Sequence, residues 1–159
     1  METPNTEEPI RVLSLGCGVQ SSTLALLLET TDLLPKVDCA VFSDVGAEPL
    51  SVYDWLDYLR TQVSYPIYQV MEKDGLLTNI ESGLRDGKRW SNPPFFTKND
   101  EGKKGMLMRT CTYDYKIRPI RRKLKELIGL TKYARLPKEV RVINLMGIST
   151  DEIQRKRFS

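Results

Sequence analysis

Short apolar runs rich in β-branched residues alternate along the chain with segments of helical periodicity. Strands are predicted over residues 10–15, 37–43 and 67–71. Apolar residues recur at helical spacing in the segments that follow them, over 21–29, 50–63 and 76–84. Because parallel strands need a long crossover, which a helix supplies, this alternation predicts an α/β fold with a mainly parallel sheet flanked by helices.

The alternation lapses between residues 86 and 109. Glycines and prolines lie there among lysines, with Trp90, Phe95 and Phe96 interleaved. A structureless segment of this length is typically either a functional loop or a disordered one. It is interpreted as a flexible lid that folds its own small core, with stacking of the aromatic rings on nucleic-acid bases as the alternative.

Regular patterning resumes after this segment. An amphipathic basic helix is predicted over 117–128 and a last strand over 140–146. At 159 residues the chain has the length of one ordinary domain. We therefore interpret residues 1–159 as a single domain that carries an inserted flexible loop or lid over 86–109.

The chain contains no histidine, which narrows its chemistry. Ser-His-Asp and Cys-His catalysis are excluded, and so is any zinc site that uses imidazole. Catalysis must then use carboxylates, lysine, arginine, hydroxyls, backbone amides, a metal ion held by oxygen ligands, or one of the three cysteines. Those cysteines are odd in number and widely spaced, and the acidic start lacks the apolar region of a signal peptide. We expect a cytoplasmic protein without a membrane span.

Positive charge is concentrated in the second half of the chain. One cluster comprises Lys116, Arg118, Arg121, Arg122, Lys123 and Lys125. A second comprises Arg155, Lys156 and Arg157. Both clusters are compatible with phosphate binding and equally with a solvated helix face, so charge alone does not decide between them.

A glycine-containing turn joins the first predicted strand to the first predicted helix. Residues 14–23 read Ser-Leu-Gly-Cys-Gly-Val-Gln-Ser-Ser-Thr. Glycine permits a sharp turn, and the first amides of a helix have no partner within it, so a phosphate fits there. The turn lacks the Gly-Lys-Ser/Thr ending of a Walker loop. The residues themselves leave two interpretations open, an anion site or an ordinary helix N-terminus.

Four segments, in order, resemble the adenine-nucleotide alpha-hydrolase superfamily. Residues 16–21 resemble its PP-loop, Ser-Gly-Gly-x-Asp-Ser, and residues 42–48 resemble its second-strand block. Residues 111–119 resemble the Cys-x4-Lys-x2-Pro block, and residues 147–155 resemble Gly-x-Arg-x-x-Glu-Ser-x-x-Arg. The sequence is most similar to the phosphoadenosine phosphosulfate reductase-like branch, whose short phage and bacterial members carry Gly-Val-Gln-Ser in the loop.

The resemblance implies a HUP-type, doubly wound, three-layer α/β/α fold with a nucleotide across the carboxyl ends of the strands. It assigns nucleotide binding to residues of three of the blocks and to the preceding strand: Ser14, Gly16, Gly18, Val19, Gln20, Ser21, Ser22, Asp44, Gly46, Gly147, Ser149, Asp151, Glu152 and Arg155. It assigns catalysis to Lys116 and Arg118, which supply positive charge. Cys111 is a further catalytic candidate because it follows the loop and precedes a basic helix, with an unreactive structural cysteine as the alternative. Gln20 stands where the loop motif has aspartate, and Ser149 where the family often has arginine.

The activity that the resemblance favours is cleavage of ATP between its α- and β-phosphates, with transient adenylation of an acceptor. ATP or phosphoadenosine phosphosulfate is the expected nucleotide, with Mg²⁺ bridging the phosphates of ATP. Three scattered cysteines do not supply the four ligands of an iron–sulfur cluster. The expected partners are an adenine nucleotide and a nucleic-acid or protein acceptor. A homodimer or a partner subunit stays open.

Other interpretations are kept beside this one. Thiol-dependent reduction of an adenylyl sulfate through Cys111 is one, although the Glu-Cys-Gly-like tail of the reductases has no counterpart in the sequence. A non-catalytic nucleotide-binding or sequestering module and a nucleic-acid-modification subunit are the others. For single residues, Asp44 is alternatively a cap for the helix after Pro49, and the pair Asp151 and Glu152 binds magnesium or caps a helix.

Overall fold

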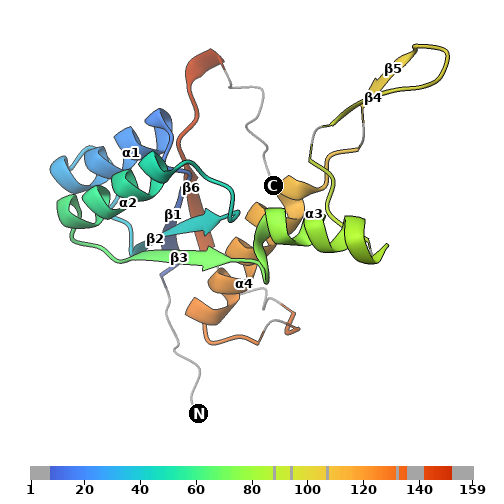
Figure 1. Ribbon diagram of the computed structural model, residues 1–159. Helices are drawn as coiled ribbons and strands as arrows, with labels where there is room; N and C mark the ends of the chain where they lie inside the picture. The colour runs from blue at the N-terminus through green and yellow to red at the C-terminus, as the bar shows by residue number, and fades with distance from the viewer. Residues whose placement is uncertain are drawn as a thin grey trace.

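A four-stranded parallel sheet is the centre of the fold (Figure 1). The computed structural model describes residues 8–87, 89–93, 95–106, 108–131, 133–135 and 142–151. The sheet strands are β1 (Ile10–Leu15), β2 (Cys39–Asp44), β3 (Ile67–Met71) and β6 (Val142–Met146), in the spatial order β3-β2-β1-β6. The helices are α1 (Val19–Thr30), α2 (Leu50–Gln62), α3 (Gly75–Asp86) and α4 (Arg118–Leu127).

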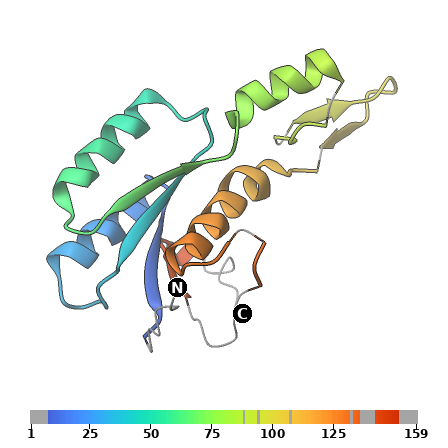
Figure 2. The same ribbon diagram turned by 90° about the horizontal axis from the view of Figure 1, so that it is seen from below.

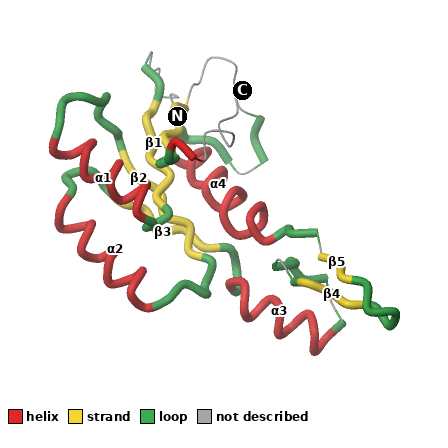
Figure 3. The backbone as a smooth tube through the Cα atoms, turned by 90° about the horizontal axis from the view of Figure 1, so that it is seen from above, coloured by secondary structure: helices red, strands yellow, loops and turns green. Residues whose placement is uncertain are grey.

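Helices cover both faces of the sheet (Figures 2 and 3). On one face, Leu13 and Phe42 of the sheet pack with Leu28 of α1 and with Leu56 and Leu59 of α2. On the other face, buried side chains of β1 and β2 meet α4 through Ile120, Leu124 and Leu127. Because the sheet is apolar on both sides, every residue of β2 is buried, as expected of a central parallel strand. The predicted three-layer α/β/α arrangement is confirmed.

The predicted elements are present, with shifted ends. The first helix begins two residues earlier than predicted, at Val19, because Gly18 is its N-cap. Strand β2 starts at Cys39 and includes Asp44. The last strand is described from Val142 to Met146, and residues 140 and 141 lie outside the described residues. None of the described helices combines the length and apolar composition needed to cross a membrane.

The segment over 86–109 differs from the prediction of a structureless loop. It contains an antiparallel hairpin of β4 (Phe96–Lys98) and β5 (Lys104–Met106). Each strand has only three residues, too few for a recognisable alternation of apolar and polar positions. The hairpin lies beyond α3, away from the central sheet (Figures 2 and 3). Trp90 packs against Gly83 of α3 and near Phe95, so this region has a small core of its own.

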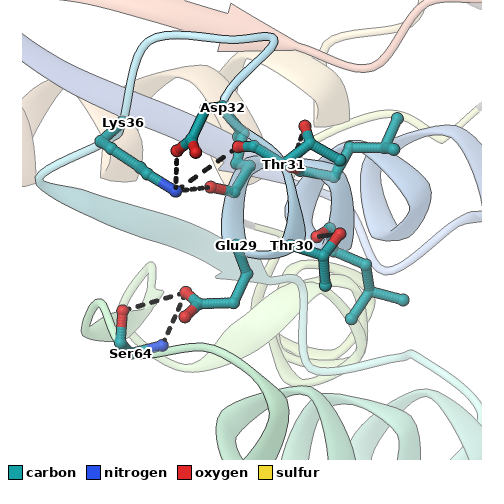
Figure 4. Close-up of polar contacts among 9 residues, drawn as sticks. Glu29, Thr30, Thr31, Asp32, Lys36 and Ser64 are labelled. Carbon is teal, nitrogen blue, oxygen red and sulfur yellow. Dashed lines mark hydrogen bonds and ion pairs between the residues drawn. The ribbon is translucent and has the colours of Figure 1, made fainter.

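Two side chains secure the C-terminal end of α1 (Figure 4). The ammonium group of Lys36 donates to the carbonyls of Leu28 and Thr31, each at 3.4 Å. Carbonyls in the last turn of a helix have no partner within it, and a cation there also interacts favourably with the helix dipole. Glu29 accepts bonds from the backbone N–H and the hydroxyl of Ser64, both at 2.9 Å. These contacts hold α1 to the loop after α2.

The glutamate contact has a consequence for acid stability. The two hydrogen bonds from Ser64, the backbone N–H first, lower the pKa of Glu29 below its ordinary value of 4.5. A carboxyl whose pKa is lowered by folding contributes stability above its unfolded pKa and loses it as the pH falls through the folded pKa. Glu29→Gln is therefore expected to lose less unfolding free energy than the parent between about pH 5 and about pH 3.

The measurement is urea unfolding across that pH range. Asp54→Asn, which neutralises an exposed carboxylate on α2, is the matched control and should follow the parent curve. Equal pH slopes for the parent and Glu29→Gln would contradict the assignment.

Candidate functional site

The turn between β1 and α1 leaves the first amides of α1 facing outward at the carboxyl end of β1. Cys17 has a φ of 54°, in the left-handed region, which reverses the chain sharply. The hydroxyl of Ser21 accepts a bond from the Gly16 N–H and donates to the Gly18 carbonyl, both at 3.2 Å. No side chain caps the start of α1. The amides of its first turn are thus left for a ligand.

The end of β6 forms a second wall beside this turn. A Cβ added to Gly147 would lie 2.5 Å from the carbonyl carbon of Gln20 and 2.6 Å from the amide nitrogen of Ser21. Only glycine permits this backbone contact. Lower in the site, the Ser14 hydroxyl donates to the side-chain oxygen of Asn144 at 2.8 Å, which joins β1 to β6.

A helical segment forms the third wall. Residues Tyr113–Ile117 adopt a π-helix that continues directly into α4. The Ser43 hydroxyl donates to the Tyr115 carbonyl at 2.7 Å, which ties this segment to the end of β2. Lys116 lies 3.7 Å from the carboxylate of Glu48. Single π-turns of this kind are frequent at functional sites.

These three walls enclose a cavity of about 620 Å³. Its polar lining residues are Ser14, Gln20, Ser21, Ser43, Glu48, Lys116, Arg121 and Asn144. Its remaining lining residues are Leu15, Gly16, Gly18, Phe42, Ile117, Ile120, Leu124, Met146, Gly147 and Ile148. A cavity of this size is typical of small-molecule and cofactor sites, and it lies where parallel sheets usually bind ligands.

Comparisons with protein-family models, with curated proteins and with solved structures find no match to this chain.

The structure brings several of the residues singled out from the sequence to the cavity and holds others away from it. Those that line it are Ser14, Gly16, Gly18, Gln20, Ser21, Lys116 and Gly147. Val19 and Ser22 lie instead on the α2 side of the turn, in an apolar groove. There the Ser22 hydroxyl accepts a bond from the indole N–H of Trp55 at 2.8 Å.

Asp44 is held by its own neighbours and is not among the residues that line the cavity. Its buried carboxylate accepts bonds from the Gly46 N–H at 2.7 Å, the Tyr53 hydroxyl at 2.9 Å and the Gln69 amide at 2.9 Å. It makes no capping bond to α2, so the alternative of a helix cap is wrong. Gly46, with a φ of 70°, packs against Gly75 at the start of α3. Asp44 therefore fixes the loop after β2.

Removing this carboxylate should destabilise the fold. Asp44→Ala leaves three donors without their acceptor, and a cost of about 2 kcal/mol in unfolding free energy is expected. Asp44→Asn keeps an oxygen for Gly46 and Tyr53 and should recover most of that loss. Urea unfolding of both variants tests this, and equal destabilisation by the two substitutions would contradict it.

Two of the residues assigned to catalysis lie off the cavity. Arg118 forms an ion pair with Asp114 and lies over the ring of Tyr113, with its guanidinium 5.7 Å from the ring centre. Cys111 lies at the start of the helical segment, where its N–H donates to the Asn92 carbonyl at 3.3 Å, and it is not among the lining residues. Neither side chain is placed to touch a ligand in the cavity.

The block after β6 is only partly described. Ser149 follows the lining residue Ile148, and its hydroxyl is buried without a hydrogen-bond partner among the described residues. Asp151 is exposed and does not line the cavity. Glu152 and Arg155 lie outside the described residues, as do Lys156 and Arg157. Their predicted roles therefore have no structural description.

Glu48 and Asn144 line the cavity although the sequence did not assign them to a site, and Arg121, which was named only as one member of a basic cluster, lines it too. The sequence pattern nevertheless points to Arg121. The lining positions of the helical segment, 116, 117, 120, 121 and 124, recur at helical spacing. The apolar residues among them therefore mark the inward face of the predicted helix. Arg121 belongs to that face and Arg118 does not.

The electrostatics of the cavity favour an anion. Lys116 and Arg121 outnumber Glu48, the one acidic residue of the described lining, and the start of α1 adds the positive end of its dipole.

Burial, with a smaller effect from Glu48, raises the pKa of the Cys17 thiol to about 11, so this thiol stays protonated at neutral pH. The described residues contain no group of three or more His, Cys, Asp or Glu side chains arranged to hold a metal ion.

Proposed function

We propose that the cavity binds ATP through its phosphates and that the protein cleaves ATP between the α- and β-phosphates while an acceptor is adenylated. The observation that supports this most is the convergence of two anion-binding elements on one cavity. The free amides of the first turn of α1 approach it from one side, and Lys116 and Arg121 approach it from the other. The resemblance to PP-loop proteins adds the adenine nucleotide and the position of the cleaved bond.

The proposed reaction is an attack on the α-phosphorus of ATP. A nucleophilic oxygen of the acceptor forms a bond to the α-phosphorus, and the bond from that phosphorus to the bridging oxygen of the β-phosphate breaks. The acceptor loses its proton to solvent, and pyrophosphate leaves with the negative charge. In this proposal the free backbone amides at the start of α1 bind the pyrophosphate, while Lys116 and Arg121 offset charge on the α-phosphate. Mg²⁺ bound to the phosphates needs few protein ligands.

The chain is assigned to the cytoplasm in this proposal. Its three cysteines, Cys17, Cys39 and Cys111, are all free, as is usual in a reducing compartment. ATP is available there.

Incubation with Mg²⁺ and ATP, followed by chromatography of the nucleotides and by a binding isotherm, tests the proposal. AMP, or an adenylated acceptor, together with pyrophosphate is the expected result. ADP and phosphate would contradict the position of cleavage, and binding without turnover would indicate a sequestering module. The absence of binding by ATP would overturn the proposal.

Cys111→Ser separates this proposal from thiol-dependent sulfur chemistry. Because Cys111 is not among the residues lining the cavity, the variant is expected to keep ATP binding and cleavage unchanged. Release of sulfite from phosphoadenosine phosphosulfate with a thiol donor, lost in Cys111→Ser, would favour the reductase reaction instead.

A further inference from the structure

The hairpin of β4 and β5 is exposed along its whole length. All residues of both strands are exposed, and Phe96 and Met106 are 82% and 60% exposed. The hairpin stands apart from the central sheet, beyond the end of α3 (Figure 3).

The strand register places the large apolar side chains and two lysines of the hairpin on one face. Phe96 pairs with Met106, and Lys98 pairs with Lys104. Because paired residues share a face and residues two apart lie on the same side of a strand, these four side chains form a single surface, which we call the ribbon face. The opposite face carries Thr97 and Gly105 and is nearly flat.

The pair of lysines on the ribbon face lowers the stability of the hairpin. Like charges directly opposite each other, as in the Lys98–Lys104 pair, destabilise a hairpin, and a lone two-stranded hairpin is marginal in water. The base of the hairpin is nevertheless anchored. The Asn92 carbonyl accepts bonds from the amides of Thr110 and Cys111, and the Ser91 hydroxyl donates to Asp114 at 2.6 Å. The two lysines are thus presented at a defined place.

Charge around the ribbon face favours an anionic occupant. Lys103, Arg89 and Arg109 are exposed near it in the chain. The acidic residues of the segment over 86–109 are Asp100 and Glu101 in the turn and Asp86, which forms an ion pair with Arg85. Positive charge is therefore in excess. A second copy of the chain would bring lysines against lysines, whereas a polyanion relieves the repulsion within the Lys98–Lys104 pair.

We propose that the ribbon face binds single-stranded nucleic acid. An exposed aromatic ring stacks on an unpaired base, since every base has a π-face, and the lysines on either strand contact successive phosphates. A duplex keeps its bases stacked and leaves Phe96 without a partner. This site is separate from the nucleotide cavity and does not depend on the function proposed for it.

Fluorescence anisotropy with labelled oligothymidylate of about 20 nucleotides tests this site on the full chain. Phe96→Ala is expected to weaken binding about tenfold, and Lys98→Gln/Lys104→Gln is expected to reduce the slope of log affinity against log salt by about 1.4. Lys73→Gln/Arg135→Gln, which removes the same charge at two exposed positions elsewhere, is the matched control and should keep the slope within experimental error. The hairpin variants should bind ATP as the parent does.

Several outcomes would overturn the proposal. They are the absence of oligonucleotide binding by the parent, equal binding by the parent and Phe96→Ala, and a preference for duplex over single strand. A concentration-dependent dimer in sedimentation that Phe96→Ala abolishes would also overturn it, since the ribbon face would then join two copies. Unchanged melting temperatures for the variants exclude unfolding as the cause of a loss.

Discussion

Gly147→Ala is expected to destabilise the protein by about 3 kcal/mol and to abolish ATP binding at concentrations that saturate the parent. The added methyl would lie 2.5 to 2.6 Å from backbone atoms of Gln20 and Ser21. Backbone cannot rotate aside as a side chain does, so the end of β6 must separate from the start of α1. That separation opens the wall of the cavity and displaces the amides proposed to hold the phosphates.

Gly18→Ala is the matched control, because Gly18 lines the same cavity with room for a methyl group. The nearest atom to its added Cβ would be the side-chain oxygen of Gln20 at 3.9 Å, and its φ is −81°. Urea unfolding should separate the two variants clearly, with Gly18→Ala losing less than about 1 kcal/mol. An unchanged unfolding midpoint and an unchanged ATP isotherm for Gly147→Ala would show that the contact is not tight in solution.

The architecture was predictable because strands and helices of ordinary length leave strong periodic signals. The strands over 10–15 and 67–71 were located without error, and the order of βα units determined a parallel sheet with helices on both faces. The glycine turn after β1 was also recognisable, since the sequence places a strand before it and a helix after it. Only its local geometry, with Cys17 in the left-handed region, required the structure.

The hairpin and the π-helix were not predictable by the same means. Strands of three residues are shorter than the alternation that identifies them, and Gly105 interrupts one of them. The π-helix adds a residue to the turn before α4, which a helical period of about 3.6 residues does not reveal. Arg118 was assigned by the resemblance of residues 111–119 to a family block, whereas in the structure it pairs with Asp114 and Arg121 lines the cavity.

The clearest test of the site uses the charges on the helical wall. Lys116→Gln and Arg121→Gln are each expected to weaken ATP binding by at least about tenfold, because a hydrogen bond to a charged group contributes about 1.5 to 3 kcal/mol. Lys116→Gln also leaves the carboxylate of Glu48 without its cation beside the bound phosphates, so its loss should be the larger of the two. The double variant is expected to bind about a hundredfold more weakly.

Arg118→Gln provides the comparison on the same segment. It removes the same charge only a few residues from Arg121, but its guanidinium is paired with Asp114 and packed over Tyr113, away from the cavity. Long-range charge alone would make Arg118→Gln as harmful as Arg121→Gln, especially at low salt. Direct contact predicts a change of less than about threefold for Arg118→Gln at physiological salt, because exposed pairs at a distance are screened. ATP isotherms of the three variants at two salt concentrations distinguish these cases, and equal losses at Arg118 and Arg121 would remove the helical wall from the site.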